Sequence, residues 1–246
     1  MHVVPIDQLV LDYGAKYFCP ALARFIALTN EPDLTRVQLE ARLHGIRIPF
    51  RSVQVWHRIK YLCEDPVSGA TVTADSVHVR PSSIDYRGCT VPGHFDTALV
   101  NEGTGGDTGI EGEYNMLYMA KLIKDCQGYC VGRVRAVFSI PNRFHNVTFR
   151  RGTTVPQQLV YIEWYTPFSD EPDRNHLLYK ISPLRDQTGG PICSVIPLAN
   201  IHRSIHLLPR FGPSAPQDWT HSNILDLCTT FYVNDFTDKH SFRILC

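Results

Sequence analysis

The spacing of apolar residues changes at residue 51, and this change constrains the fold more than any other feature of the sequence. From there on, Val53, Val55 and Ile59 alternate with polar or amphipathic residues such as Gln54 and Arg58. A period of two residues is typical of a strand with one buried face. Eight further runs repeat the theme between Pro, Gly, Asn and Asp, as strands joined by turns do. The nine runs are 52–62, 76–81, 94–101, 129–140, 158–168, 177–182, 193–201, 204–210 and 229–236.

The first 50 residues have helical spacing instead. Apolar residues in 7–28 come closest to intervals of three and four, with Pro20 as a break or a first-turn residue. A second short helix is predicted over 34–43, with Gly45 as a stop signal. A third is predicted over 222–228, where Ser222 or Asn223 provides the cap.

These patterns predict a mostly β (α+β) fold, an antiparallel barrel or sandwich with a helical N-terminal flank. The predicted organisation is a helical flank at 1–50 and a β-rich body at 51–246, with a loop or insertion at 101–128. The glycine-rich stretch that opens this segment follows a strand, but it lacks the Lys-Ser/Thr pair of a phosphate-binding P-loop. We therefore expect a surface loop there.

Charge and cysteine content narrow the function classes. Lys plus Arg and Asp plus Glu each number 24, so no overall field attracts nucleic acid or an anionic membrane, and any such contact has to be local. The eight cysteines show no framework spacing, which favours reduced thiols in a cytoplasmic or nuclear protein. Neither a secretion signal nor a membrane span is indicated.

Two strands carry the residues most suggestive of a binding surface. Alternation in 129–140 and 158–168 predicts that Arg133, Arg135 and Glu163 point outward. If these strands pair, a cross-strand Arg–Glu contact is the purely structural interpretation. The other interpretation is a basic patch with interleaved rings that holds phosphates and stacks bases or peptide cations. That patch comprises Arg133, Arg135, Arg143, Arg150, Arg151, Tyr161 and Tyr165, whereas the predicted inward side comprises Val134, Ala136, Phe138, Ile140, Val160, Ile162 and Trp164.

No spacing predicts a catalytic residue, a metal ligand set or a cofactor. His202 and His206 are four residues apart, but Arg203 lies beside them and no third ligand is indicated. Cys126 and Cys130 lack a second pair. A metal-dependent hydrolase or nuclease whose site the fold assembles from dispersed Asp and His residues stays open as an alternative. The scattered carboxylates are Asp75, Asp85, Asp96, Glu163, Asp170, Glu171, Asp173, Asp226 and Asp235.

The order of several segments resembles a known family. The series VTADSVHVRP, FDTALVN, VGRVRAVFSIP, LVYIEWYTPF, LYKIS, VIPLANIHRSIHLLPRFG and the final W-x-x-x-N-x-L-D-x-C-x-x-F-x-V-N-x-F resembles the C-terminal region of Plavaka-type transposases of fungal DNA transposons, from about Leu39 to the end. The acidic catalytic core of that family lies upstream of the matched region. The resemblance therefore implies a nuclear, non-catalytic module that binds DNA or a chromatin or other protein partner, with no catalytic residue to carry over.

The chain departs from that family pattern at Glu113–Gly128, where sixteen residues with helical spacing are interposed. We hypothesise an in-frame retained intron at this point, which also leaves open a relic reading frame without selected activity. A second likeness concerns the fold. The order of E-W-Y-T-P, a Leu-Tyr strand, V-I-P-L and a His-rich turn is distantly similar to bromo-adjacent homology (BAH) domains, which implies a chromatin-reading β barrel, although no aromatic cage can be matched.

Overall fold

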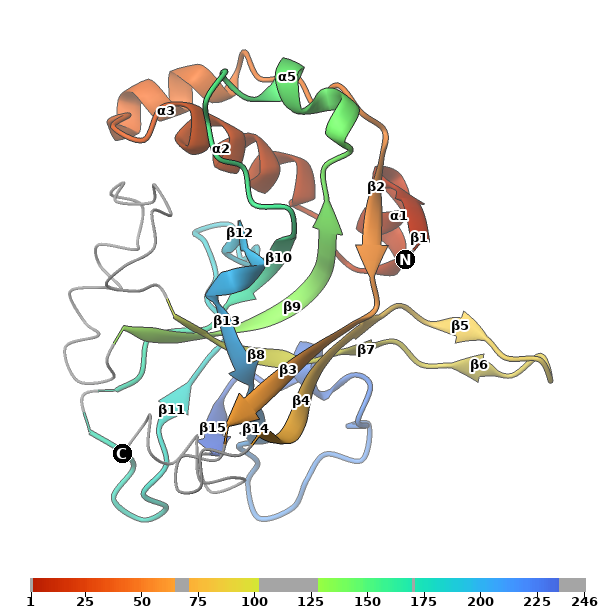
Figure 1. Cartoon of the computed structure of the whole chain (residues 1–246). Helices are drawn as coiled ribbons and strands as arrows, with labels where there is room; N and C mark the ends of the chain where they lie inside the picture. The colour runs from red at the N-terminus through yellow and green to blue at the C-terminus, as the bar shows by residue number, and fades with distance from the viewer. Residues whose placement is uncertain (1, 65–70, 102–127, 170, 235–246) are drawn as a thin grey trace.

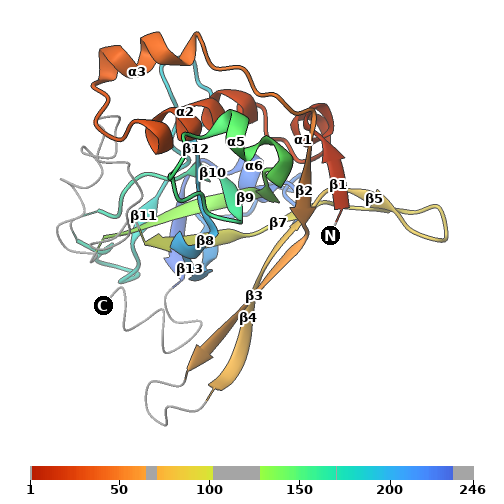
Figure 2. The same ribbon diagram turned by 45° about the horizontal axis from the view of Figure 1, so that its top comes forward.

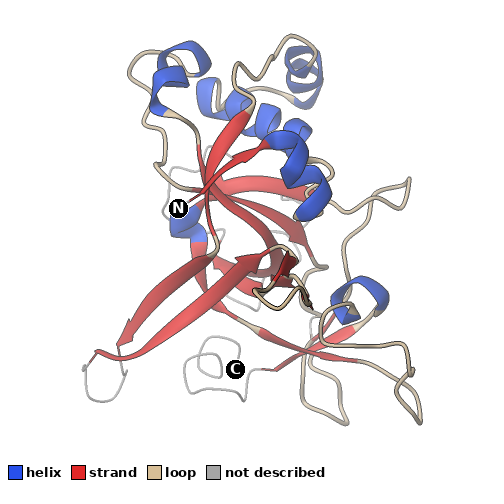
Figure 3. Ribbon diagram, turned by 90° about the vertical axis from the view of Figure 1, so that its right-hand side faces the viewer, coloured by secondary structure: helices blue, strands red, loops and turns tan. Residues whose placement is uncertain are grey.

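The computed structural model describes residues 2–64, 71–101, 128–169 and 171–234. Strands predominate, all pairings between the named strands are antiparallel, and most of the helical residues gather at one end of the molecule (Figure 3). The mostly β class predicted from the sequence is therefore confirmed. The described strands form four sheets, none of which closes into a barrel.

The largest sheet is built around one long strand, β9, which pairs with three others. Its C-terminal part pairs with β2 and its N-terminal part with β8, so these two strands follow one another along the same edge of β9. The opposite edge of β9 pairs with β10. The strands of this sheet are β1 (His2–Pro5), β2 (Ser52–Trp56), β8 (Thr97–Asn101), β9 (Tyr129–Ser139), β10 (Leu159–Trp164), β12 (Cys193–Pro197) and β13 (Ile201–Ser204).

Helices cover one face of this sheet near the top of Figure 1. The aromatic ring of Phe18 packs against Phe138 with centroids 4.9 Å apart, and against Tyr161 at 5.9 Å. Pro20 lies in the first turn of its helix, where its missing N–H costs no hydrogen bond. A Thr35–Gln38 capping box starts the next helix. The helical segments are α1 (Ile6–Asp12), α2 (Phe18–Asn30), α3 (Arg36–Leu43), η1 (Asn142–Phe144) and α5 (His145–Thr148).

Three smaller sheets branch from this body. The β3–β4 ribbon projects from it in Figure 2, and the β5–β6 arm extends to the right in Figure 1. A third group lies toward the C-terminus and packs on the far end of β9. The elements are β3 (Arg58–Glu64), β4 (Thr71–Arg80) and β7 (His94–Phe95); β5 (Ser83–Ile84) and β6 (Thr90–Val91); and β11 (Lys180–Ile181), β14 (His206–Pro209) and β15 (Phe231–Asn234), with η2 (Leu198–Asn200) and α6 (Ile224–Leu227) nearby in sequence.

Both faces of the central sheet are buried, which corrects the one-sided faces predicted from alternation. Between Val134 and Ala136, β9 contains one residue more than the segment of β10 that pairs with it. This bulge places Val134 and Ala136 on opposite faces of the sheet. Val134 therefore packs with Val160 and Ile162, whereas Ala136 packs on the helical side. Alternation alone cannot locate such a bulge, because the polar and apolar residue types around it still alternate.

The predicted loop or insertion at 101–128 joins β8 to β9, and its residues 102–127 lie outside the described part of the chain. The predicted helix within Glu113–Gly128 and the retained-intron hypothesis fall on those residues as well. The helices that the structure describes include none long and apolar enough to cross a membrane.

Candidate metal centre

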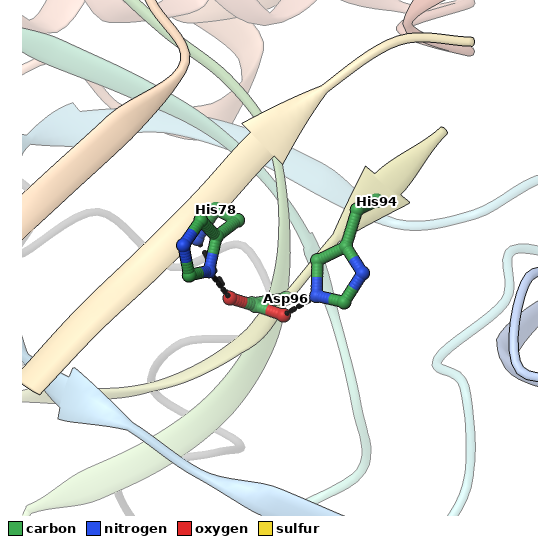
Figure 4. Close-up of side chains that lie close together, drawn as sticks. All are labelled: His78, His94 and Asp96. Atoms are coloured by element: carbon green, nitrogen blue, oxygen red, sulfur yellow. Dashed lines mark hydrogen bonds and ion pairs between the residues drawn. The ribbon is translucent and has the colours of Figure 1, made fainter. Parts of the chain in front are cut away.

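Two histidines and one aspartate come together where the β3–β4–β7 sheet leaves the main sheet (Figure 4). Nδ1 of His78 lies 3.1 Å from Oδ2 of Asp96, and Nε2 of His94 lies 2.6 Å from Oδ1 of the same carboxylate. One ligand atom from each residue lies within 4.8 Å of the other two. In the part of the chain that the structure describes, this is the only such group of His, Cys, Asp and Glu side chains.

Strand register explains why these side chains share one face. Arg80 of β4 lies directly opposite His94 of β7, and directly opposite residues point to the same side of a sheet. His78 lies two residues before Arg80 and Asp96 two residues after His94, so the period of two places them on that side as well. The alternating residues Val77 and Val79 are fully buried on the other side.

The backbone fixes Asp96 between the two sheets. Its N–H donates to the carbonyl of His78 at 3.0 Å, and its own carbonyl accepts from the N–H of Val134 on β9 at 3.0 Å. The carboxylate also accepts from the backbone N–H of His78 at 2.6 Å. The carboxylate is therefore held in place before any ligand binds, with both histidine rings turned toward it.

A cavity of about 570 Å³ opens beside this cluster and is lined by further basic side chains. His57 lies at one wall, where its Nε2 is 2.8 Å from the hydroxyl of Tyr13. Burial, and then the positive charges of His2 and Arg80, lower the pKa of His57. Its ring is therefore neutral at neutral pH. The cavity-lining residues with polar side chains are His57, Arg58, His78, Arg80, His94 and His221.

A second cavity, of about 430 Å³, shares His94 and His221 with the first and also contacts Asp96. Among the described residues that line the two cavities, Asp96 is the only carboxylate. The side chains of His78 and His94 are 43% and 54% exposed, so both rings are open to solvent. Solvent can therefore reach the cluster from the cavities.

Two imidazoles and one carboxylate form a ligand set that fits a divalent transition metal ion. Ligand atoms around a bound zinc ion lie about 3.3 Å apart. The His78–Asp96 separation of 3.1 Å is near that value, whereas the His94–Asp96 separation of 2.6 Å is a hydrogen-bond distance that has to lengthen when an ion binds. Three protein ligands leave at least one coordination position for water or a substrate. The histidine–aspartate cluster, meaning His78, His94 and Asp96, therefore has the composition of an open metal site.

The residues predicted to form an aromatic basic patch are placed differently. Tyr161 and Tyr165 are 0% and 2% exposed, so their predicted outward orientation is wrong. Tyr161 lies under α2, and Tyr165 packs edge-on against Phe231 of the C-terminal sheet with centroids 5.9 Å apart. Burial raises the pKa of both phenols. Stacking of bases on these rings is excluded, because the sheet is covered on both faces.

Arg133 is also buried, at 5% exposure, so its outward orientation was predicted wrongly. Its guanidinium donates to both oxygens of Asp226, and Arg135 donates to Glu163 at 2.8 Å and to Asp226 at 3.0 Å. The predicted pairing of the two strands and an Arg–Glu contact between them are confirmed, although the ion pair is largely shielded from water. We call Arg133, Arg135, Glu163 and Asp226 the arginine–carboxylate cluster.

The remaining arginines of the predicted patch are exposed and lie apart from these two clusters. Arg143 stacks over the ring of Phe144 at 4.8 Å, and Arg150 pairs with Glu31 of the helical layer. Arg151 follows in an exposed turn. These three side chains are positioned around the helical end of the molecule and are not brought together with Arg133 and Arg135.

The histidine pair considered from spacing is not assembled into a metal site in the described structure. His202 lies on β13 and contacts Tyr129, whereas His206 lies on β14, which pairs with β15 in a different sheet. Cys130 is buried in the core, and Cys126 lies outside the described residues. The signal that was missed is His94-Phe95-Asp96, in which two ligand types two residues apart on a strand share a face.

Comparisons of the chain with protein-family models, with curated proteins and with solved structures find no match. The resemblance to transposase C-terminal regions is therefore neither supported nor contradicted, and it stays a prediction.

Proposed function

We propose that this chain is a metal-dependent hydrolase whose divalent ion is bound by His78, His94 and Asp96. The observation that carries the proposal is the convergence of the three ligand atoms within 4.8 Å, beside a solvent-accessible cavity. A divalent ion with an open coordination position lowers the pKa of a bound water and makes it a nucleophile near neutral pH. The chain contributes a carboxylate fixed by backbone hydrogen bonds and two imidazoles aimed at it.

A purely structural role for the cluster is the competing explanation. Asp96 accepts hydrogen bonds from both rings and from the N–H of His78, which satisfies the carboxylate without an ion. The open cavity and the exposure of both rings support the metal, because a purely structural hydrogen-bonded group gains more from being shielded from water. Direct measurement of metal binding separates the two explanations.

The test compares the purified protein with His94→Ala and with His44→Ala as a matched control. His44 is an exposed histidine at the end of α3. Titration with Zn²⁺ or Mn²⁺ is expected to show one ion per chain and a stabilisation of about 2.7 kcal/mol at a free metal concentration one hundred times the Kd. His94→Ala is expected to lose both and His44→Ala to keep both. Equal binding by the two variants would overturn the metal site.

Hydrolysis is measured separately on p-nitrophenyl acetate, p-nitrophenyl phosphate and bis-p-nitrophenyl phosphate. Metal-loaded protein is expected to hydrolyse at least one of them, and Asp96→Asn is expected to remove that activity. Metal binding without metal-dependent hydrolysis of any of the three would overturn the catalytic part of the proposal and leave a metal-binding protein.

Binding of DNA or of a chromatin partner in the nucleus, by a module derived from a transposase, stays a prediction, as does the finer likeness to a BAH-type barrel. Of the side chains expected to carry that binding, Arg143, Arg150 and Arg151 are the ones exposed at the surface. A relic reading frame without activity also stays open, and stoichiometric metal binding would argue against it.

A further inference from the structure

We propose that the metal site takes a phosphate ester, whose phosphate oxygens are bound jointly by the metal ion and by Arg58 and Arg80. This inference rests on the proposed function, because the metal provides one of the contacts. Both arginines line the same 570 Å³ cavity as His78 and His94. The inference adds a substrate class, phosphate esters, to the proposed function.

Strand register places each arginine beside a metal-binding histidine. Arg58 of β3 lies directly opposite His78 of β4, and Arg80 of β4 lies directly opposite His94 of β7. The Cβ atoms of directly opposite residues in an antiparallel pair are about 5 Å apart, on the same side of the sheet. His78 and Arg80 share that side because they are two residues apart. Two histidines and two arginines therefore form one continuous row across three strands.

The net charge of this row of side chains favours an anionic ligand. Both arginines are exposed at the cavity, and Asp96 is the only carboxylate among the described residues that line either cavity. With a divalent ion bound, the positive charges of the ion and of two guanidinium groups exceed the single negative charge of Asp96. An anion that binds between them relieves this repulsion, so the site favours a negatively charged ligand.

Geometry favours phosphate over carboxylate. A guanidinium group binds two oxygens of one anion through parallel N–H donors, and a metal ion needs a further oxygen. A carboxylate has two oxygens, whereas a phosphate monoester has three non-bridging oxygens directed to different sides. The row of Arg58, His78, Arg80 and His94 lines one cavity with two guanidinium groups and two metal ligands, which is more than the two oxygens of one carboxylate can contact. Arginine and metal ions are the usual partners of a phosphoryl group during transfer.

In hydrolysis of such an ester, the oxygen of a water molecule forms a bond to phosphorus and the bond from phosphorus to the alcohol oxygen breaks. The proton of the water ends on the alcohol, so the products are the alcohol and inorganic phosphate. Neutral His57 lies in the same cavity and has an imidazole nitrogen that can accept that proton on its way.

The proposal predicts that removal of an arginine has opposite effects on metal binding with and without phosphate. Phosphate and metal must strengthen the binding of one another by the same factor, because coupling between two ligands is reciprocal. Removal of Arg80 is expected to remove most of this coupling. In the absence of phosphate, the same substitution is expected to tighten metal binding slightly, because a repelling cation is lost.

The experiment measures the Kd of Co²⁺ by calorimetry with and without inorganic phosphate, at concentrations where cobalt phosphate stays in solution. Wild-type protein is expected to bind Co²⁺ about tenfold more tightly with phosphate present. Arg80→Gln and Arg58→Gln are expected to lose most of that gain without weaker binding of Co²⁺ alone. Arg87→Gln is the control, because Arg87 lies in the turn of the β5–β6 arm, over the ring of Tyr86 and away from the cavity lining.

Acetate replaces phosphate in a parallel titration. Co²⁺ binding without any effect of phosphate, or an equal effect of acetate, would overturn the phosphate inference and leave the metal site intact. No Co²⁺ binding by wild-type protein would overturn the proposed function itself. A gain that persists in Arg80→Gln and Arg58→Gln would show that these arginines do not contact the anion and would also overturn the inference.

Discussion

The molecule holds two clusters of charged and titratable side chains, and they differ in how completely they are paired. In the arginine–carboxylate cluster, two guanidinium groups meet two carboxylates, and each forms at least one ion pair. In the histidine–aspartate cluster, two rings share a single carboxylate beside an open cavity that two arginines also line. A cavity of about 360 Å³ also borders the first cluster, so the two clusters differ in charge and not in available room. The charges of the first cluster are matched by its own side chains, whereas the second leaves positive charge that a ligand can offset.

Burial follows the same division. The side chains of Arg133, Arg135 and Glu163 are 6%, 12% and 13% exposed, and only Asp226 of that cluster is half exposed. A charge removed from water requires a partner close by, which the opposite side chains provide. Asp226 lies in α6, a few residues before β15, so its contacts attach the C-terminal segment to β9. Matched charges in this cluster stabilise the fold, whereas the exposed, unmatched cluster is suited to binding.

The largest effect is expected for Arg135→Met, which removes the partner of a shielded carboxylate. Glu163 would then lose its hydrogen-bonded partner in a largely buried position, so the unfolding free energy is expected to fall by about 3–5 kcal/mol. Urea denaturation measures this change. The double variant Arg135→Met with Glu163→Gln is expected to lose less than the sum of the two single variants, because neither charge is left alone. A loss below about 1 kcal/mol for the single variant would contradict a stabilising role for the cluster.

A smaller effect is expected for Asp226→Asn, because this carboxylate is half exposed to solvent. The unfolding free energy is expected to fall by about 1–2 kcal/mol, less than for a fully buried pair. Burial raises the pKa of Asp226, but the hydrogen bonds and charges of Arg133 and Arg135 lower it more, so the net shift is downward.

The sign of that shift fixes the pH dependence. A carboxyl group with a lowered pKa in the folded state contributes its full stabilisation above its unfolded pKa of about 3.9. That contribution is lost as the pH falls through the lower folded pKa. Wild-type protein is therefore expected to lose more stability than Asp226→Asn between pH 5 and pH 2, about the range in which such a group titrates. Asp218→Asn, at an exposed carboxylate of the same segment, is the control, and equal acid sensitivity of all three proteins would contradict this account.

Strand periodicity predicts much of this fold because it is a local property. The predicted run 129–140 corresponds to β9 (Tyr129–Ser139), and the run 158–168 contains β10 (Leu159–Trp164). Whether a face of the sheet is covered by another element depends on residues distant in the sequence. Tyr161 is buried because α2, more than 130 residues earlier in the chain, packs on it. No alternation within β10 carries that information, and the bulge in β9 removes the regular phase that the prediction assumed.

The histidine–aspartate cluster could not be predicted from the sequence for a related reason. His94 and Asp96 are two residues apart, and the strand period alone places them on one face. His78 joins them because β4 pairs with β7 across the β5–β6 arm, and only the register Arg80↔His94 brings the three residues together. The arm separates the two strands by residues that carry no signal for this pairing. The composition of the site was visible in the sequence, but its assembly was not.

The smallest effect on stability is expected for His94→Asn in metal-free protein, and this prediction tests the contrast between the two clusters most directly. The ring of His94 is 54% exposed, and Asp96 keeps its hydrogen bonds from the backbone and the ring of His78 when it is lost. The unfolding free energy is therefore expected to change by less than about 1 kcal/mol. Added Zn²⁺ is expected to raise the melting temperature of wild-type protein and to leave that of His94→Asn unchanged. Urea and thermal denaturation with and without the ion measure both quantities. A large loss of stability in metal-free His94→Asn would show that this cluster, like the arginine–carboxylate cluster, serves to hold the fold together.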